Sequence, residues 1–161
     1  MIEILSGLEP RLRSSNSAAV LAISKVFLKM GRLKGDLLVK LLKTLRRSLL
    51  SFLHNEVPEI EYVVLRHIEY IMSAFETDIF DADYKRFIVG GNEPTYLKAT
   101  KIRLLRLSSG KHNFADVVAE FAEYLFDEEI SKNAVAALAE MLVGSAENDA
   151  RFIAKTIVRT I

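Results

Sequence analysis

The side chains in this sequence that are best placed for chemistry are basic ones near its N-terminus. Lys40, Lys43 and Arg47 are spaced so that they share one side of a predicted helix, and Arg46 lies beside them. More basic residues precede this helix: Lys25, Lys29, Arg32 and Lys34. Clusters of positive charge attract anionic lipid headgroups, nucleic acids or acidic protein faces. We therefore take Lys40, Lys43, Arg46 and Arg47 as a candidate contact with an anionic membrane or with another protein subunit.

Two other interpretations of these charges remain open. A solvated helix face opposite a stripe of leucines would carry the same residues without binding anything. Nucleic acid is the weaker functional choice, because no aromatic residues interleave the basic ones and no known nucleic-acid-reading motif is present. We therefore expect no nucleic-acid partner.

Residue types that usually mark a catalytic or metal site do not form a recognisable pattern. His54, His67 and His112 lack a second ligand at helical spacing, and no HExxH motif is present. Gly90 and Gly91 stand outside any phosphate-binding motif, so an ordinary turn is expected there. Acidic residues recur along one predicted helix, where a solvated face is expected: Asp116, Glu120, Glu123 and Asp127. We expect no catalytic residues, metal, cofactor or small-molecule substrate, and hence no enzyme.

The overall composition favours a folded, helical chain. Half of the 161 residues are hydrophobic, whereas glycine and proline are few and no run of alternating β-branched residues is present. Cysteine is absent, which excludes disulfides and thiolate chemistry. The net charge of +1 divides unevenly, because residues 1–50 carry +7 and residues 51–161 carry −6. Charged residues interrupt every apolar stretch before the roughly 18 residues that a membrane span needs.

The helix predicted over residues 58–72 indicates how the chain is organised. Pro58 suits a first helical turn, and apolar residues recur on two neighbouring faces of the segment that follows. One face carries Ile60, Val63, Val64, Ile68 and Ile71, and the other carries Tyr62, Leu65 and Met72. A helix with two apolar faces must be flanked on two sides, as the inner helices of stacked helical repeats are.

Similar helices are predicted along the rest of the chain. Their ranges are 2–13, 18–30, 36–53, 113–126 and 129–143, with a stunted helix within 76–91 and a last one beyond residue 145. A further helix is predicted to restart at Asn92–Pro94 and to carry its apolar faces on Tyr96, Leu97, Ile102, Leu104 and Leu105. Val26, Ile68, Ile102 and Leu138 occupy corresponding places at spacings of 42, 34 and 36 residues. Such spacings are typical of two-helix HEAT or armadillo units. We therefore predict an all-α fold, a right-handed α-solenoid of helical hairpins, in which residues 1–161 form a single segment of a longer protein.

Three blocks of sequence resemble a known family. They are Ser17–Leu21 (SAAVL), Pro58–Arg66 (PEIEYVVLR) and Asn92–Lys98 (NEPTYLK), the last followed by Arg103–Ser108 (RLLRLS). Their order and spacing are similar to those in the trunk of the β-adaptins, the large β subunits of clathrin adaptor complexes. The resemblance runs from about residue 4 to residue 161, and it departs from the family at Gly90 and Gly91 and in a shortened turn near residues 31–35.

The resemblance implies a non-enzymatic scaffold segment from the middle of an adaptin trunk. Its partners would be the second large chain and the medium chain of the adaptor, and the complex would be a cytoplasmic membrane coat. It would lie peripherally on coated vesicles, the Golgi or the plasma membrane, and would act in clathrin-associated vesicle transport, including endocytosis. Clathrin binding itself is not expected of these residues. The alternative is a HEAT-repeat module of another assembly, such as a nuclear transport factor or a phosphatase scaffold.

Overall fold

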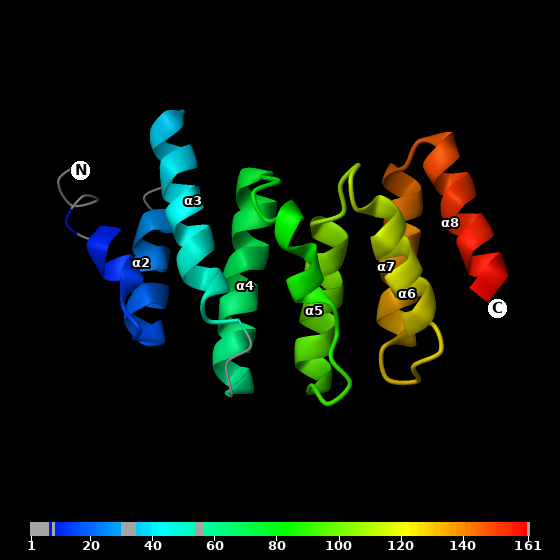
Figure 1. Cartoon of the computed structure of the whole chain (residues 1–161), viewed down its shortest axis with the longest axis horizontal. Coiled ribbons are helices and arrows are strands. Elements are labelled where there is room, and N and C mark those ends of the chain that lie inside the picture. The colour runs from blue at the N-terminus through cyan, green and yellow to red at the C-terminus, as the bar shows by residue number, and fades with distance from the viewer. Residues whose placement is uncertain (1–6, 8, 30–34, 54–56, 161) are drawn as a thin grey trace. The chain divides into compact units, whose positions relative to one another are not determined.

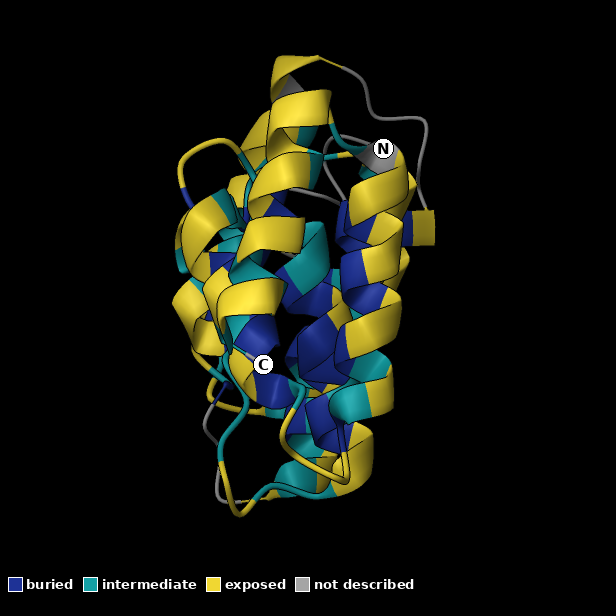
Figure 2. Ribbon diagram, turned by 90° about the vertical axis from the view of Figure 1, so that its right-hand side faces the viewer, coloured by how far each residue is buried: buried dark blue, intermediate teal, exposed yellow. Residues whose placement is uncertain are grey.

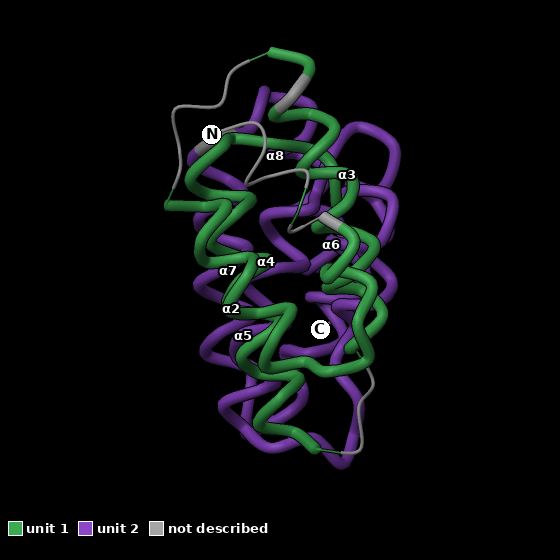
Figure 3. The backbone as a smooth tube through the Cα atoms, turned by 90° about the vertical axis from the view of Figure 1, so that its left-hand side faces the viewer, with its two compact units in different colours: residues 1–80 green, residues 81–161 purple. Residues whose placement is uncertain are grey.

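The computed structural model describes residue 7 and residues 9–29, 35–53 and 57–160. Within these residues every regular element is a helix, and no strand occurs. The all-α fold predicted from the sequence is therefore confirmed. The chain divides into two compact units, Met1–Phe80 and Asp81–Ile161, which Figure 3 shows in different colours. Each unit is described by itself.

The described residues of unit 1 from Glu9 onward form a short 3₁₀ helix followed by three α-helices (Figure 1). Their bounds are η1 Glu9–Arg13, α2 Ser17–Lys29, α3 Asp36–Leu50 and α4 Pro58–Phe75. Asn16 caps α2, because its Oδ1 accepts the backbone N–H of Ala19 at 3.1 Å. Pro58 occupies the first turn of α4, as predicted, and Glu76 ends that helix in the left-handed conformation with φ 45°.

The helices of unit 1 enclose an aliphatic core. Helices α2 and α4 pack against each other, and α3 packs against both, so every helix is in contact with the other two. Figure 2, in which the helices of unit 2 face the viewer, shows there that helices are buried on one side and exposed on the other. The fully buried or nearly buried apolar residues of unit 1 include Val20, Phe27, Leu42, Leu45, Leu49, Val64, Leu65, Ile68 and Ile71.

Unit 2 contains a 3₁₀ helix followed by four α-helices. Their bounds are η2 Asp81–Phe87, α5 Thr95–Leu107, α6 Phe114–Tyr124, α7 Ser131–Gly144 and α8 Glu147–Thr160. The stunted helix expected within residues 76–91 is therefore η2. Helix α5 packs on α7 and α6 packs on α8, while α7 contacts both α6 and α8. Alternate helices thus lie in the same layer, which is how successive hairpins stack in an α-solenoid.

Several positions predicted to be buried are not. Val26 is 43% exposed and Val63 is 38% exposed, although Val26 was one of the four corresponding repeat positions. In α2 the buried place goes to the neighbouring Phe27, which removes more apolar area from water. Ile60 is only half-buried and Leu142 is 38% exposed. The apolar stripes are wider than the buried sector of each helix, so their edges remain in water.

Some sequence predictions fall outside the described residues. These are the helix over residues 2–6, the turn over residues 30–34, His54 and the final Ile161. The sequence also predicts an open apolar face on the last helix, formed by Ile153, Ala154, Ile157 and Ile161. In α8 Ile153 is fully buried and Ile157 is half-buried, whereas Ala154 is exposed, as are Phe152 and Val158.

We predict that Ile68→Ala destabilises the chain by about 2–5 kcal/mol, because it leaves a cavity at a position with no exposure. The matched control is Val63→Ala on the same helix, where 38% exposure should keep the loss near 1 kcal/mol or less. Urea unfolding followed by circular dichroism measures both changes. Equal destabilisation by the two substitutions would contradict the burial pattern of α4.

Candidate interaction surfaces

The four basic residues singled out in the sequence lie on α3. Lys40, Lys43 and Arg47 are exposed, and Arg46 at the border of this face is half-buried. The opposite side of α3 carries Leu42, Leu45 and Leu49, each at 5% exposure or less. Because the leucines anchor one side of α3, the helix holds the basic side chains together on its outer side. We call Lys40, Lys43, Arg46 and Arg47 the α3 basic face.

The earlier group of basic residues lies apart from this face along the chain. Lys25 and Lys29 are exposed on α2, whereas Arg32 and Lys34 lie outside the described residues. The sequence therefore predicted two basic groups, and the described part of the structure places them on different helices.

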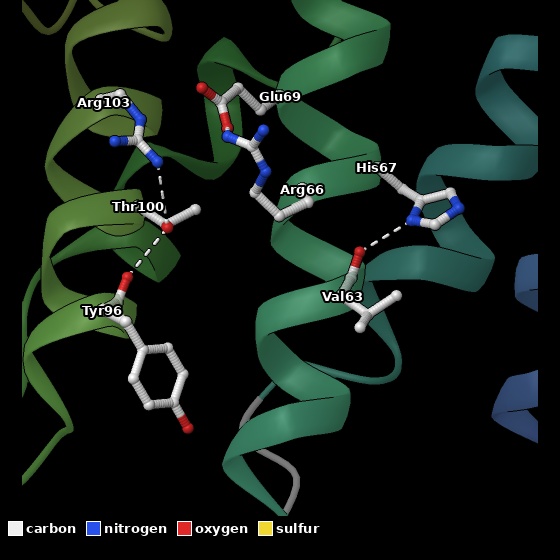
Figure 4. Close-up of polar contacts among 7 residues, drawn as sticks. All are labelled: Val63, Arg66, His67, Glu69, Tyr96, Thr100 and Arg103. Atoms are coloured by element: carbon white, nitrogen blue, oxygen red, sulfur yellow. Dashed lines mark hydrogen bonds and ion pairs between the residues drawn. The ribbon is translucent and has the colours of Figure 1, made fainter.

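The histidines form no metal site with the residues that the structure describes. The ring of His67 donates from Nδ1 to the carbonyl oxygen of Val63 at 2.7 Å, within the same helix (Figure 4). His112 is exposed in the turn before α6. Among the described residues, no three histidine, aspartate or glutamate side chains gather closely enough to hold a metal ion. The Nδ1 atom of His67 is thus hydrogen-bonded to the backbone of its own helix.

The acidic stripe runs along α6 and just beyond it. Asp116, Glu123 and Asp127 are exposed, as a solvated face requires. Asp116 accepts the hydroxyl of Tyr84 at 2.6 Å, and this hydrogen bond raises the pKa of Tyr84. The hydrogen bond ties η2 to α6 within unit 2. The carboxylates therefore line a surface that holds a neighbouring element, and they lack the enclosed environment in which paired acids carry out catalysis.

A polar cluster at the start of α5 was not predicted from the sequence. Lys98 is only 5% exposed, and its Nζ lies 2.5 Å from Oε2 of Glu129, just before α7. Thr95 donates to the other oxygen of the same carboxylate. The hydrogen bond from Lys98, followed by that from Thr95, lowers the pKa of Glu129, and the same bond raises the pKa of Lys98. Two residues of α5 are thereby joined to the turn that precedes α7.

Lys101 extends this cluster into the interior. It is 1% exposed and forms an ion pair with Glu93, a half-buried residue that precedes α5. Gly90 leaves room for this carboxylate, because an added Cβ would lie 2.9 Å from Oε1 of Glu93. The Glu93 carboxylate therefore lies directly against Gly90.

Three part-buried hydrogen bonds accompany the ion pairs of this region. The hydroxyl of Tyr124 accepts the backbone N–H of Val89 at 2.9 Å, and burial raises the pKa of Tyr124. Thr100 donates to the carbonyl oxygen of Tyr96 at 2.9 Å and accepts from Arg103 at 3.2 Å (Figure 4). The bond to Tyr124 holds the segment before α5, whereas the other two bonds lie within α5 itself. The sequence does carry one signal of this cluster. Lys98 and Lys101 lie among apolar residues on one helix, so their ammonium groups need carboxylate partners if they are buried.

We predict that Glu129 makes unit 2 less stable in acid. Its folded pKa lies below the ordinary value of 4.5, so the unfolded chain binds the proton more readily. The stabilisation is present above pH 4.5 and should be lost as the pH falls below that value through the folded pKa. Thermal melting from pH 7 to pH 3 should show this loss, and Glu129→Gln should remove that part of it. The exposed neighbour Glu128 provides the control, since Glu128→Gln should retain the full wild-type acid dependence.

Helices long and apolar enough to cross a membrane are not found among the described residues. Comparison with protein-family models gives no match. Curated relatives are similar, however. Beta-adaptin-like protein A of Arabidopsis thaliana is 32% identical over 131 residues, which cover 81% of this chain and 16% of that protein.

Further relatives come from other organisms. AP-1 complex subunit beta-1 of Mus musculus is 37% identical over 124 residues, covering 75% of this chain and 13% of that protein. AP-4 complex subunit beta of Dictyostelium discoideum is 26% identical over 144 residues, covering 85% of this chain and 17% of that protein. The chain thus spans less than a fifth of the length of these relatives. Its homologues are β subunits of adaptor complexes, and the chain belongs to the β-adaptin family, of which it matches a partial segment.

Proposed function

We propose that this chain is a non-catalytic scaffold segment from the middle of the trunk of an adaptor-complex β subunit. The observation that carries the proposal is the similarity to named adaptor β subunits, which reaches 37% identity over 75% of the chain. The arrangement of unit 2 supports it, because helices that stack in two layers offer long side surfaces to other subunits. The paired polar groups around α5 support the same conclusion, since their contacts hold neighbouring elements together.

The partners that we propose are the second large chain and the medium chain of the same adaptor. The assembled coat would act at the cytoplasmic surface of coated vesicles, the Golgi or the plasma membrane, in clathrin-associated transport of proteins. The segment would supply rigid surface and spacing to this coat, without a cofactor or a bound substrate.

The α3 basic face is the proposed contact with either an anionic membrane or an acidic surface of another subunit. Its exposure and its separation from the leucine side of α3 support the proposal. Positive charges at a lipid surface attract anionic headgroups, and this attraction weakens as salt is added.

The assembly proposal predicts that the chain co-purifies with the medium-chain subunit of its own adaptor complex. Co-expression followed by affinity purification and size-exclusion chromatography should show the two proteins in one peak. A medium chain from a different adaptor complex serves as the specificity control and should be recovered less. Separate elution of the cognate pair would contradict the assignment of this segment to the subunit-binding part of the trunk.

If the α3 basic face contacts an anionic membrane, the chain should sediment with anionic liposomes. Each charge close to such a surface contributes about 1 kcal/mol, so replacing all four residues of the α3 basic face by Ser should abolish most binding at low salt. Sedimentation with and without anionic lipid, at low and physiological salt, measures the effect.

The matched control replaces four exposed basic residues of unit 2 by Ser: Lys111, Lys132, Lys155 and Arg159. It removes the same charge but should leave most of the binding. Equal sedimentation of wild type and the α3 variant would rule out membrane contact by this face. Loss of medium-chain binding by the α3 variant alone would assign the face to subunit contact.

A further inference from the structure

A groove separates the outer edges of α2 and α4 in unit 1. It has a volume of about 530 Å³ and is lined by Lys25, Leu28, Lys29, Arg66, His67 and Tyr70. The two helices pack against each other, and Leu28 is 9% exposed at the contact, so the groove has an apolar floor. Its lining residues belong to neither the α3 basic face nor the polar cluster of unit 2.

The helical spacing of the lining residues gives the groove two walls. Lys25 and Lys29 are four residues apart on α2, and Arg66 and Tyr70 are four residues apart on α4. Residues at this spacing lie one above the other on a helix. The wall formed by α2 therefore carries two ammonium groups, and the wall formed by α4 carries Arg66 and an aromatic side chain.

The charges of the groove are strongly unbalanced. Three of its six lining residues are cationic and none is acidic. The guanidinium of Arg66 is turned toward Glu69, with Nη1 2.5 Å from Oε2, and remains 48% exposed (Figure 4). This ion pair offsets one positive charge at the edge, while Lys25 and Lys29 remain exposed on the opposite wall. An anionic ligand would relieve the repulsion between these like charges.

Tyr70 indicates which kind of anion fits. Its ring is 54% exposed and can contact an apolar group, and Leu28 lies in the same groove. A peptide supplies carboxylates and an apolar side chain together, whereas a flat lipid surface reaches only the charged rims of a recess. We infer that the α2–α4 groove binds an acidic peptide segment of a partner protein, with its carboxylates on Lys25 and Lys29 and an apolar side chain against Tyr70.

The larger groove of unit 2 lacks this complementarity. It has a volume of about 710 Å³, but Arg106 in its wall pairs with Glu140 at 2.9 Å, and Asp149 lines it as well. Positive and negative groups are mixed there, so it favours no charge class. The inference for unit 1 goes beyond the proposed adaptor role and does not rest on it, because it is argued from the groove alone.

The test is fluorescence anisotropy with the full chain and a labelled short peptide of glutamates around a central leucine. A peptide of the same length with glutamine in place of glutamate is the ligand control and should not bind. Replacing both Lys25 and Lys29 by Ser should weaken binding roughly five- to thirtyfold at low salt, as the loss of two exposed charge contacts implies. Tyr70→Ala, which leaves the charge unchanged, should weaken binding roughly two- to tenfold.

Matched variants separate the groove from general charge attraction. Replacing Lys43 and Arg47 on α3 by Ser removes the same charge, and Tyr96→Ala removes a similarly exposed aromatic residue from α5. Both should bind the acidic peptide as wild type does, and circular dichroism should show every variant folded. The inference is overturned if wild type does not bind the acidic peptide or if Tyr70→Ala leaves the affinity unchanged. It is also overturned if the variant lacking Lys25 and Lys29 and the variant lacking Lys43 and Arg47 lose affinity equally. Binding to anionic vesicles without binding to the peptide would also overturn it, in favour of a lipid ligand.

Discussion

The buried ammonium group of Lys101 sets the constraint to which the beginning of unit 2 adjusts. A lysine with 1% exposure is costly to bury unless a carboxylate accompanies it, and Glu93 supplies that carboxylate from the loop before α5. The loop must therefore turn back toward the helix, and Gly90 gives the Glu93 side chain the space it needs. Lys98 imposes the same requirement one turn earlier and meets it with Glu129.

These ion pairs join α5 to residues in the loops of unit 2. The carboxylate of Glu129 precedes α7, and the hydroxyl of Tyr124 at the end of α6 holds the backbone of Val89. Both ends of the α6–α7 loop are thus anchored, one to α5 and the other to the segment before it, and α5 packs on α7. Charge pairing thus supplies the register, while aliphatic burial supplies most of the free energy, because a buried ion pair by itself contributes little net stability.

In unit 1 the basic side chains lie mostly outside the core. Apolar residues such as Leu45 and Ile68 fill the interior, and the basic side chains of α2, α3 and α4 remain largely on the outside. The two basic surfaces differ in shape. The α3 basic face is the outer side of one helix, and the second surface is a groove with an aromatic wall.

The sequence by itself determined the fold class, most helix positions and the family. Helical periodicity, Pro58 at a first turn and the ordered blocks such as Pro58–Arg66 are local features, which a chain carries before it folds. It also predicted the burial of Val64 and Ile68, because both lie on an apolar face of the helix predicted over residues 58–72. Only the tertiary structure decided the edges of those stripes, where Phe27 is buried and Val26 is not. It also decided the partners of Lys98 and Lys101 and the pairing of α2 with α4 that creates the basic groove. These contacts join residues far apart in the chain, and their geometry depends on how whole helices pack, which residue spacing alone does not specify.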